Sequence, residues 1–552
     1  MSTAAQKLPG SDRARPWWRG ATIYQIYPRS FLDTNGDGIG DLPGIVQRLD
    51  YVASLGVDAI WVSPFYRSPM ADFGYDIADY RSVDPIFGTL ADFDRLVARA
   101  HELGLRVIID QVLSHTSDQH AWFTESRASR ENPKSDWYVW ADARDDGTPP
   151  NNWLSIFGGV AWTWEPRRGQ YYLHNFLKHQ PDLNFHQPEV RRAALENIRF
   201  WLERGVDGLR LDAINFCFHD LALRDNPPRP RSQRKSTGVS ASNPYGYQWH
   251  RHNNTQPEML PFLEEIRRLL DQYPDVVALG EISSDDSTAT VAEYTQPGRL
   301  HMAYSFELLS SDSSPQHIRA TVEKLRTRAP QSWPCWTISN HDVERVVSRW
   351  GRSAPQLPHF ATQLTALICA LRGSVCVFQG EELGLGEADV PYEALRDPYG
   401  IAFWPAFKGR DGCRTPMPWD SQERGGFSSG QPWLPVPPQH LALSVAAQEN
   451  DATSALHGFR RLLAWRREQP LLINGDIEFL AATESVLVFR RFDAQSAVLA
   501  AFNLSIDKAS VALPGLRFGR ALTGHGLPEG SVDNSRLQIP GHGVAFFQLA
   551  TG

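Results

Sequence analysis

The stretch Gly208-Leu209-Arg210-Leu211-Asp212-Ala213-Ile214 decides the fold of this chain, because a short apolar strand ends there in a carboxylate. Side chains two positions apart in a β-strand point to the same face, so Arg210 and Asp212 share one face. A carboxylate beside a fixed cation is expected to stay ionised, which suits a nucleophile, but a buried structural ion pair would have the same sequence. The stretch alone leaves both interpretations open.

Several other short β-type runs also end at residues that can do chemistry. Residues 107–110 end at Asp110, residues 276–281 end at Glu281, and residues 335–339 run into Asn340-His341-Asp342. Repeated strands with functional groups at their C-terminal ends are typical of a (β/α)8 barrel, the TIM barrel. Further runs bring the expected barrel strands to eight: residues 23–28, 57–62, 302–306 and 374–378.

Helical patterns separate the strands, with apolar spacing that predicts helices at residues 45–55, 87–103 and 189–205. This alternation predicts a parallel sheet with right-handed crossovers. We therefore expect an α/β fold, a (β/α)8 barrel with an inserted subdomain after the third strand and an all-β C-terminal domain. The expected boundaries are residues 1–116 and 186–472 for the barrel, 117–185 for the inserted domain and 473–552 for the C-terminal β-sandwich.

Composition and charge exclude two classes of partner. The 552 residues include 55 lysines and arginines against 63 aspartates and glutamates, a net charge of −8, which offers no basic footprint for nucleic acid. No apolar run approaches the roughly 20 residues that a membrane-spanning helix needs. The five cysteines form no CxxC pair and the N-terminus lacks an apolar signal region, so we expect a cytoplasmic protein with reduced thiols.

An Asp- and Gly-rich turn near the N-terminus is a candidate metal site. Oxygen-bearing groups recur there at every second position, and the expected ligands are Asp33, Asn35, Asp37, the Ile39 carbonyl and Asp41. The turn is not an EF-hand, because Gly44 stands where an EF-hand has its bidentate Glu. A turn that binds nothing is the alternative, and we favour a structural Ca²⁺, with Mg²⁺ as the other candidate. We expect no organic cofactor.

If the barrel forms, one group of polar residues converges on its mouth: Asp110, His115, Arg210, Asp212, Glu281, His341 and Asp342. Three acids at such a mouth fit glycoside hydrolysis, in which one carboxylate is the nucleophile, one acid with a raised pKa protonates the leaving oxygen, and one steadies the sugar. Any one of these acids alone is more simply a solvated loop carboxylate. The three together favour catalysis.

These residues belong to a set of motifs spread over the chain, at residues 110–115, 180–184, 208–212, 280–281, 340–342 and 410–417. The set resembles glycoside hydrolase family 13, the α-amylase family, and more closely its exo-acting α-glucosidase and oligo-1,6-glucosidase branch. The first of these motifs corresponds to the family's DxxxNH region and the last to the RDxxRTPM stretch. Three departures are Ser114, where the family usually has Asn, Leu209, where it usually has Phe, and Val375, where a Pro is common in the eighth strand.

The resemblance implies a retaining double displacement with Asp212 as nucleophile, Glu281 as acid and base, and Asp342 as the residue that stabilises the transition state. It also implies that Asp72 and Arg410 grip the hydroxyls of the terminal glucose and close the cleft into a one-glucose pocket. The other residues that it assigns to substrate binding are Tyr75, His115, Phe157, Phe176, Gln180, Arg210 and His341.

In the similar enzymes, a Val directly after the nucleophile goes with α-1,6 cleavage and a smaller residue goes with α-1,4 cleavage. Since this residue is Ala213 here, we expect short α-1,4-linked substrates such as maltose. A covalent glucosyl intermediate can be captured by any competing hydroxyl, so we expect α-glucosyl transfer to alcohols or sugars as well. One alternative is a sucrose or trehalose isomerase with the same acids. The other is a non-catalytic binding module, which should lack the acids and carry a membrane helix. Association into a homodimer is left open.

Overall fold

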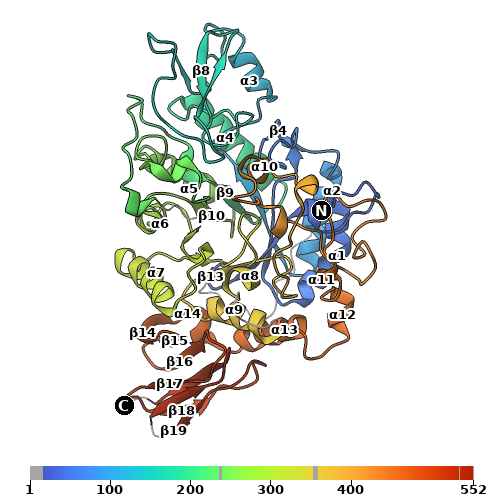
Figure 1. Ribbon diagram of the computed structural model, residues 1–552, viewed down its shortest axis with the longest axis vertical. Coiled ribbons are helices and arrows are strands. Elements are labelled where there is room, and N and C mark those ends of the chain that lie inside the picture. The colour runs from blue at the N-terminus through green and yellow to red at the C-terminus, as the bar shows by residue number, and fades with distance from the viewer. Residues whose placement is uncertain (1–15, 235–238, 352–357, 534, 551–552) are drawn as a thin grey trace.

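The structure is a computed structural model and describes residues 16–234, 239–351, 358–533 and 535–550. Eight parallel strands form its centre (Figure 1): β1 (Thr22–Ile26), β2 (Ala59–Val62), β5 (Arg106–Val112), β9 (Gly208–Asp212), β10 (Val277–Ile282), β11 (Met302–Ser305), β12 (Cys335–Trp336) and β13 (Ser374–Phe378). They pair in the order β11-β10-β9-β5-β2-β1-β13-β12, and a bridge between Ala303 and Pro334 joins the two end strands. The expected (β/α)8 barrel is confirmed.

The register of the barrel strands brings the acidic residues to one end of the barrel. Asp110 on β5 pairs with Arg210 on β9, and Glu281 on β10 pairs with Tyr304 on β11. Strands β1, β2, β9 and β10 are buried at every position, as expected for parallel strands covered on both faces. The carboxyl ends of the strands therefore form a buried polar floor at one mouth of the barrel.

Among the described residues, seven major helices lie between these strands in sequence, and an eighth, α13, follows β13: α1 (Leu42–Ser54), α2 (Leu90–Glu102), α4 (Pro188–Leu202), α5 (Met259–Leu270), α6 (Ser287–Tyr294), α7 (Pro315–Arg328), α9 (Pro358–Ala370) and α13 (Ala455–Arg467). Helix α1 begins three residues before the predicted start, because the Asp41 side chain caps it by accepting from the Gly44 N–H at 2.7 Å. A capping box of Thr89 and Asp92 sets the start of α2, also three residues from the prediction.

The seventh strand differs from its prediction. Residues 335–339 were expected to be extended, but β12 ends at Trp336. The chain then turns, and the Thr337 hydroxyl donates to the Ser339 carbonyl at 2.7 Å, a local bond that competes with a strand ladder. The turn directs Asp342 towards the barrel mouth.

Two further groups of strands lie at opposite ends of the molecule (Figure 1). Between β5 and α4 the chain forms α3 (Ala121–Ser126) and a small antiparallel sheet of β6 (Trp140–Ala141), β7 (Trp162–Glu165) and β8 (Gln170–Leu173). At the other end lie the antiparallel strands β14 (Asp476–Ala482), β15 (Val486–Phe492), β16 (Ala497–Asn503), β17 (Ala509–Ala512), β18 (Phe518–Ala521), β19 (Ser531–Asp533), β20 (Arg536–Ile539) and β21 (Val544–Leu549). The latter form the separate all-β C-terminal domain.

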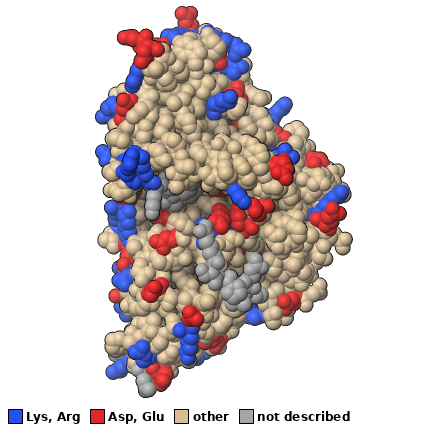
Figure 2. All heavy atoms as spheres, viewed as in Figure 1, with Lys and Arg blue, Asp and Glu red and all other residues tan. Residues whose placement is uncertain are grey.

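Short elements complete the part of the chain that the structure describes. They are β3 (Tyr66–Arg67), β4 (Asp79–Val83), α8 (Val346–Trp350), α10 (Pro398–Phe403), α11 (Pro438–Leu441), α12 (Val445–Glu449) and α14 (Pro470–Asn474). Among the described residues, no helix combines the length and the apolar character needed to cross a membrane. On the face drawn in Figure 2, acidic and basic side chains are interspersed among uncharged ones.

Candidate active site

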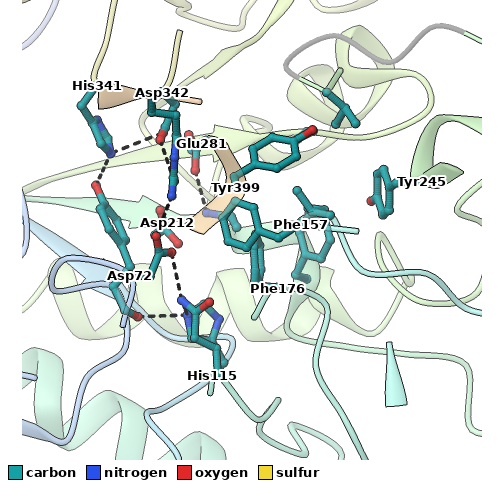
Figure 3. Close-up of a pocket in the computed structure, with 18 of the residues that line it drawn as sticks. Asp72, His115, Phe157, Phe176, Asp212, Tyr245, Glu281, His341, Asp342 and Tyr399 are labelled. Carbon is teal, nitrogen blue, oxygen red and sulfur yellow. Dashed lines mark hydrogen bonds and ion pairs between the residues drawn. The ribbon is translucent and has the colours of Figure 1, made fainter. Parts of the chain in front are cut away.

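A cavity lies at the C-terminal ends of the barrel strands (Figure 3). Eleven of the twelve residues expected in catalysis and substrate binding line it: Asp72, Tyr75, His115, Phe157, Phe176, Gln180, Asp212, Glu281, His341, Asp342 and Arg410. The twelfth, Arg210, is fully buried and contacts two of the acids from beneath. Segments far apart in the sequence therefore meet in one place.

The guanidinium group of Arg210 joins three carboxylates. Its Nη1 donates to Asp110 Oδ1 at 2.8 Å and to Asp212 Oδ1 at 2.5 Å, and its Nη2 lies 2.7 Å from Glu281 Oε1. The plane of the group packs on Trp61, with the central carbon 4.8 Å from the ring centroid. One buried cation therefore orients three acids at once and has to share its charge among them.

Burial controls the ionisation of the two central acids. It raises the pKa of Asp212 to about 7, although Arg210 pulls in the opposite direction, and the nearby Asp110 raises it further. Burial likewise raises the pKa of Glu281 to about 7. Arg210 was expected to keep Asp212 ionised by lowering its pKa. In the structure the pKa of Asp212 is raised instead, because burial and the neighbouring Asp110 carboxyl outweigh the cation. The raised pKa of Glu281 agrees with the role of a proton donor.

Asp342 has the opposite environment. Its Oδ1 accepts from Arg414 Nη2 at 2.9 Å and from Arg410 Nη1 at 3.3 Å, and its Oδ2 lies 3.3 Å from His341 Nε2. Burial favours the neutral acid, but these neighbours outweigh it and hold the pKa of Asp342 well below its usual range. Since burial lowers the pKa of His341 to about 3, the two arginines supply the positive charge at neutral pH. Asp342 therefore stays ionised.

Arg410 and Asp72 close one end of the cavity. Arg410 Nη2 donates to Asp72 Oδ1 at 2.8 Å, and Asp72 is 3% exposed. Asp397 holds the guanidinium from behind, because it accepts from Nη2 at 2.8 Å and from Nε at 3.1 Å. The fork of Arg410 is thereby fixed in one orientation.

Gln180 links the inserted segment to this closed end. Its Nε2 donates to Asp72 Oδ2 at 3.2 Å and lies 3.1 Å from His115 Nε2. The other ring nitrogen of His115, Nδ1, lies 3.0 Å from the hydroxyl of Ser114. Ser114 therefore makes a polar contact that helps to orient His115 at the position where the similar family usually has an amide.

Tyr75 and His341 form a stacked pair at the cavity wall. Their ring centroids are 5.3 Å apart and the planes differ by 3°, and the Tyr75 hydroxyl lies 2.6 Å from His341 Nε2. Gln25 reaches the other ring nitrogen at 2.7 Å. Both imidazole nitrogens are therefore occupied, which fixes the ring plane.

The side of the cavity opposite the acids is aromatic. In Figure 3, Phe157, Phe176, Tyr245 and Tyr399 lie on one side of the pocket, while the carboxylates gather on the other. Arg410 bridges the two sides, since its central carbon is 4.8 Å from the Phe157 ring centroid. The site thus combines a polar side that can bind sugar hydroxyls with an aromatic side.

Sequence reasoning missed several residues of the cavity and its support: Phe216, Tyr245, Tyr304, Phe306, Asp397, Tyr399 and Arg414. Arg414 lies in the RDxxRTPM stretch already singled out, and Tyr245 lies in the segment between β9 and α5. Nothing in the local sequence distinguishes the other aromatic residues from ordinary core residues.

The predicted metal ligands lie in a tight turn before α1. Asp33 Oδ2 accepts from Gly38 N–H at 2.8 Å, Asp37 Oδ1 accepts from Ile39 N–H at 2.8 Å, and Asp41 caps α1. Each carboxylate oxygen of a turn like this keeps a lone pair that can face a cation. Within the described residues, no three or more His, Cys, Asp or Glu side chains form a group that could hold a metal. The calcium site stays a prediction.

Comparison with known proteins gives one consistent result. A model described as "Alpha amylase, catalytic domain" matches residues 25–475. A probable alpha-glucosidase of Rhizobium meliloti is 54% identical over 97% of this chain and 98% of its own length, and an oligo-1,6-glucosidase of Heyndrickxia coagulans is 38% identical over 90% and 94%.

Solved structures agree in fold over nearly the whole chain. An alpha-glucosyl transfer enzyme, XgtA, superposes with a TM-score of 0.96 at 63% identity and covers 97% of this chain and 100% of its own. An isomaltulose synthase mutant from Erwinia rhapontici, in complex with sucrose, superposes with a TM-score of 0.87 at 32% identity and covers 98% and 100%.

Proposed function

Because the chain belongs to glycoside hydrolase family 13, the α-amylase family, we propose that it is a retaining exo-α-glucosidase. It releases α-glucose from the non-reducing end of short α-glucosides. The observation that carries the proposal is that Asp212 and Glu281 line one cavity and contact two nitrogens of one guanidinium group. The relatives named alpha-glucosidase and oligo-1,6-glucosidase support the same reaction class.

The reaction proceeds in two steps. Asp212 attacks the anomeric carbon while Glu281 protonates the leaving oxygen, which forms a covalent glucosyl ester and releases the aglycone. Glu281, now ionised, takes a proton from water, and the water oxygen displaces Asp212 from the anomeric carbon. Asp342 stays ionised between its two arginines and stabilises the positive charge that develops on the sugar in both steps.

The closed end of the cavity supports exo action on a single glucose unit. Asp72 and Arg410 are joined there at 2.8 Å, and we infer that this pair blocks a further sugar beyond the terminal glucose. A carboxylate and a guanidinium group can bind neighbouring hydroxyls of that glucose as a fork. We assign the linkage preference to α-1,4 on the basis of Ala213, which follows the nucleophile. Faster hydrolysis of isomaltose than of maltose would reverse that assignment.

Transfer of glucose to hydroxyl acceptors is part of the proposal. The covalent intermediate is chemically open to any hydroxyl that outcompetes water, and the aromatic side of the cavity favours acceptors with apolar surface over water. Similarity to an alpha-glucosyl transfer enzyme supports this extension. The second candidate is an isomerase that keeps the released sugar, which similarity to an isomaltulose synthase in complex with sucrose favours.

One experiment separates these activities. The initial products from maltose are measured with and without an added alcohol, and the products from sucrose and trehalose are measured in parallel. An exo-α-glucosidase gives glucose from maltose and an alkyl α-glucoside when alcohol is present, whereas an isomerase gives a rearranged disaccharide from sucrose. Asp212→Asn should lower every one of these rates by at least about 10⁴-fold, because the nucleophile is lost. Retained maltose hydrolysis in that variant would contradict the proposal.

We also propose that the turn at residues 33–41 binds a structural Ca²⁺, with Mg²⁺ as the alternative. Asp33, Asn35, Asp37, the Ile39 carbonyl and Asp41 would hold it, and the cation would stabilise the fold rather than act in catalysis. A cytoplasmic location is a further expectation, and the choice between a monomer and a homodimer is open. Cell fractionation and light scattering of the purified protein test them.

A further inference from the structure

Tyr304 lies directly beside Glu281 in the barrel. The two residues are partners in the parallel register of β10 and β11, and Tyr304 is 2% exposed. Its ring packs against Trp61, with the centroids 6.3 Å apart. The phenol hydroxyl is therefore held in place below the carboxylate by the barrel itself.

The hydrogen bonds of the Tyr304 hydroxyl have only one consistent direction. Arg210 donates to the phenol oxygen from Nη2 at 2.8 Å and from Nε at 3.3 Å, and a guanidinium group can only donate. The single phenol proton is then directed at Glu281 Oε1, 3.0 Å away. Burial raises the pKa of Tyr304 well above its usual value, so the phenol keeps this proton at neutral and mildly alkaline pH.

The two oxygens of Glu281 consequently differ. Oε1 receives the phenol proton of Tyr304 and also lies 2.7 Å from Arg210 Nη2. Among the described residues, Oε2 receives only the backbone N–H of Ala213, at 3.0 Å. A proton on Oε1 would have to displace one of two donors, whereas a proton on Oε2 leaves a lone pair for the amide.

We propose that Tyr304 is a positioning residue that donates to Oε1 of Glu281 and thereby assigns the acid proton to Oε2. The inference rests on the proposed function, in which Glu281 is both acid and base. In the first step the proton leaves Oε2 for the departing oxygen, and in the second step Oε2 recovers a proton from the attacking water. The donor at Oε1 stabilises the ionised form, so near the pKa of Glu281 it keeps a larger fraction of this residue ionised and able to accept a proton from water in the second step.

Other charged groups also face Glu281, and all of them stay in place when only the phenol hydroxyl is removed. They are Arg210 and Asp212 on β9, Asp110 on β5, and Asp342 after β12. Tyr304→Phe keeps the aromatic ring and removes one donor. A change in the pH dependence of this variant therefore reports the loss of that donor.

The test measures kcat/KM for maltose against pH in the wild type and in Tyr304→Phe. Loss of a hydrogen bond to the ionised carboxylate should raise the pKa of Glu281. The alkaline limb of the kcat/KM profile should then lie about one pH unit higher. At neutral pH an aryl α-glucoside with a good leaving group should show lower kcat and lower KM, because the glucosyl intermediate accumulates. Tyr294→Phe is the matched control, since its buried hydroxyl has no hydrogen-bond partner among the described residues and does not line the cavity.

The outcomes separate the inference from the function on which it rests. An unmoved alkaline limb in Tyr304→Phe, with Glu281→Gln inactive on maltose, would overturn the role of Tyr304 alone. Full activity of Glu281→Gln would overturn the proposed function. If Tyr304→Phe does not fold, replacement of Tyr304 by 3-fluorotyrosine keeps the shape and makes the phenol a stronger donor. The alkaline limb should then move down, and an upward or absent shift would overturn the inference.

Discussion

Arg410 and Asp72 are 338 positions apart in the sequence, yet Arg410 Nη2 donates to Asp72 Oδ1 at 2.8 Å and closes the active-site cavity of this enzyme. Neither partner is free to move. Asp397 fixes the arginine from one side, and Gln180 donates to the other carboxylate oxygen of Asp72 at 3.2 Å. A preorganised pair of this kind can bind sugar hydroxyls without further ordering.

Arg410→Lys should lower kcat/KM for maltose by about 10²-fold, because an ammonium group keeps the charge but loses the planar fork that holds Asp72 and Asp397. Initial rates over a range of maltose concentrations measure this effect. Arg396→Lys is the control, as this exposed neighbour lies outside the cavity lining and should leave kcat/KM unchanged. Equal rates for Arg410→Lys and wild type would show that the fork does not grip the substrate.

Glu381 should make the folded protein less stable as the pH rises. Burial raises its pKa to about 8, above the ordinary value of 4.5, so the folded state binds more protons than the unfolded state between these values. Its contribution is therefore most favourable below pH 4.5 and is lost as the pH rises towards 8.

Glu381→Gln should remove this loss. At pH 9 the variant should have a higher free energy of unfolding than the wild type. The difference should be at most about 1.4 kcal/mol for each pH unit between the unfolded and folded pKa values of Glu381, and it should be small near pH 5. Denaturant unfolding at both pH values measures the difference. Glu102→Gln, on an exposed side chain, should show no such trend. A wild type that is as stable as Glu381→Gln at pH 9 would contradict the prediction.

Removal of divalent cations should lower the melting temperature by several degrees if the turn at residues 33–41 binds Ca²⁺. Thermal melts with EDTA, then with Ca²⁺ or Mg²⁺ added back, measure the effect and identify the ion. Asp37→Asn should weaken the recovery, and the exposed Asp50→Asn should not. Identical melts with and without EDTA, together with no metal in the purified protein, would refute the site.

Arg491 should be essential for the junction between the barrel and the C-terminal domain. It is fully buried and donates from Nη1 to the carbonyls of Ala370 and Leu472, both at 2.7 Å, and from Nη2 to the carbonyl of Gly475 at 2.7 Å. Arg491→Met leaves these buried acceptors unpaired and should lower the free energy of unfolding by about 3 kcal/mol or more.

Arg490→Met provides the control for this prediction in denaturant unfolding. Arg490 is the adjacent residue on β15, but it is 39% exposed and paired with Glu478 on the surface. Its loss should lower the free energy of unfolding by less than about 1 kcal/mol. Equal effects of the two substitutions would mean that the junction does not depend on Arg491.

The sequence by itself determined the architecture and the reacting groups. Apolar runs separated by helical patterns indicated the eight strands, four of which end in or run into functional side chains, because the alternation of strand and helix is a local property of the chain. The same local pattern identified Asp212, Glu281 and Asp342 as a set. It failed at residue 337, where a hydroxyl-to-carbonyl bond ended the seventh strand early.

Only the tertiary structure decided which groups surround each acid, because those neighbours come from other strands and loops. The sequence placed Arg210 beside Asp212, but burial and Asp110 from another strand reverse the expected effect on the pKa of Asp212. Tyr304 and Asp397 gave no local signal, since a buried tyrosine or a loop aspartate is common in any barrel. Ionisation depends on desolvation and on charges in space, and neither can be read from positions along the chain.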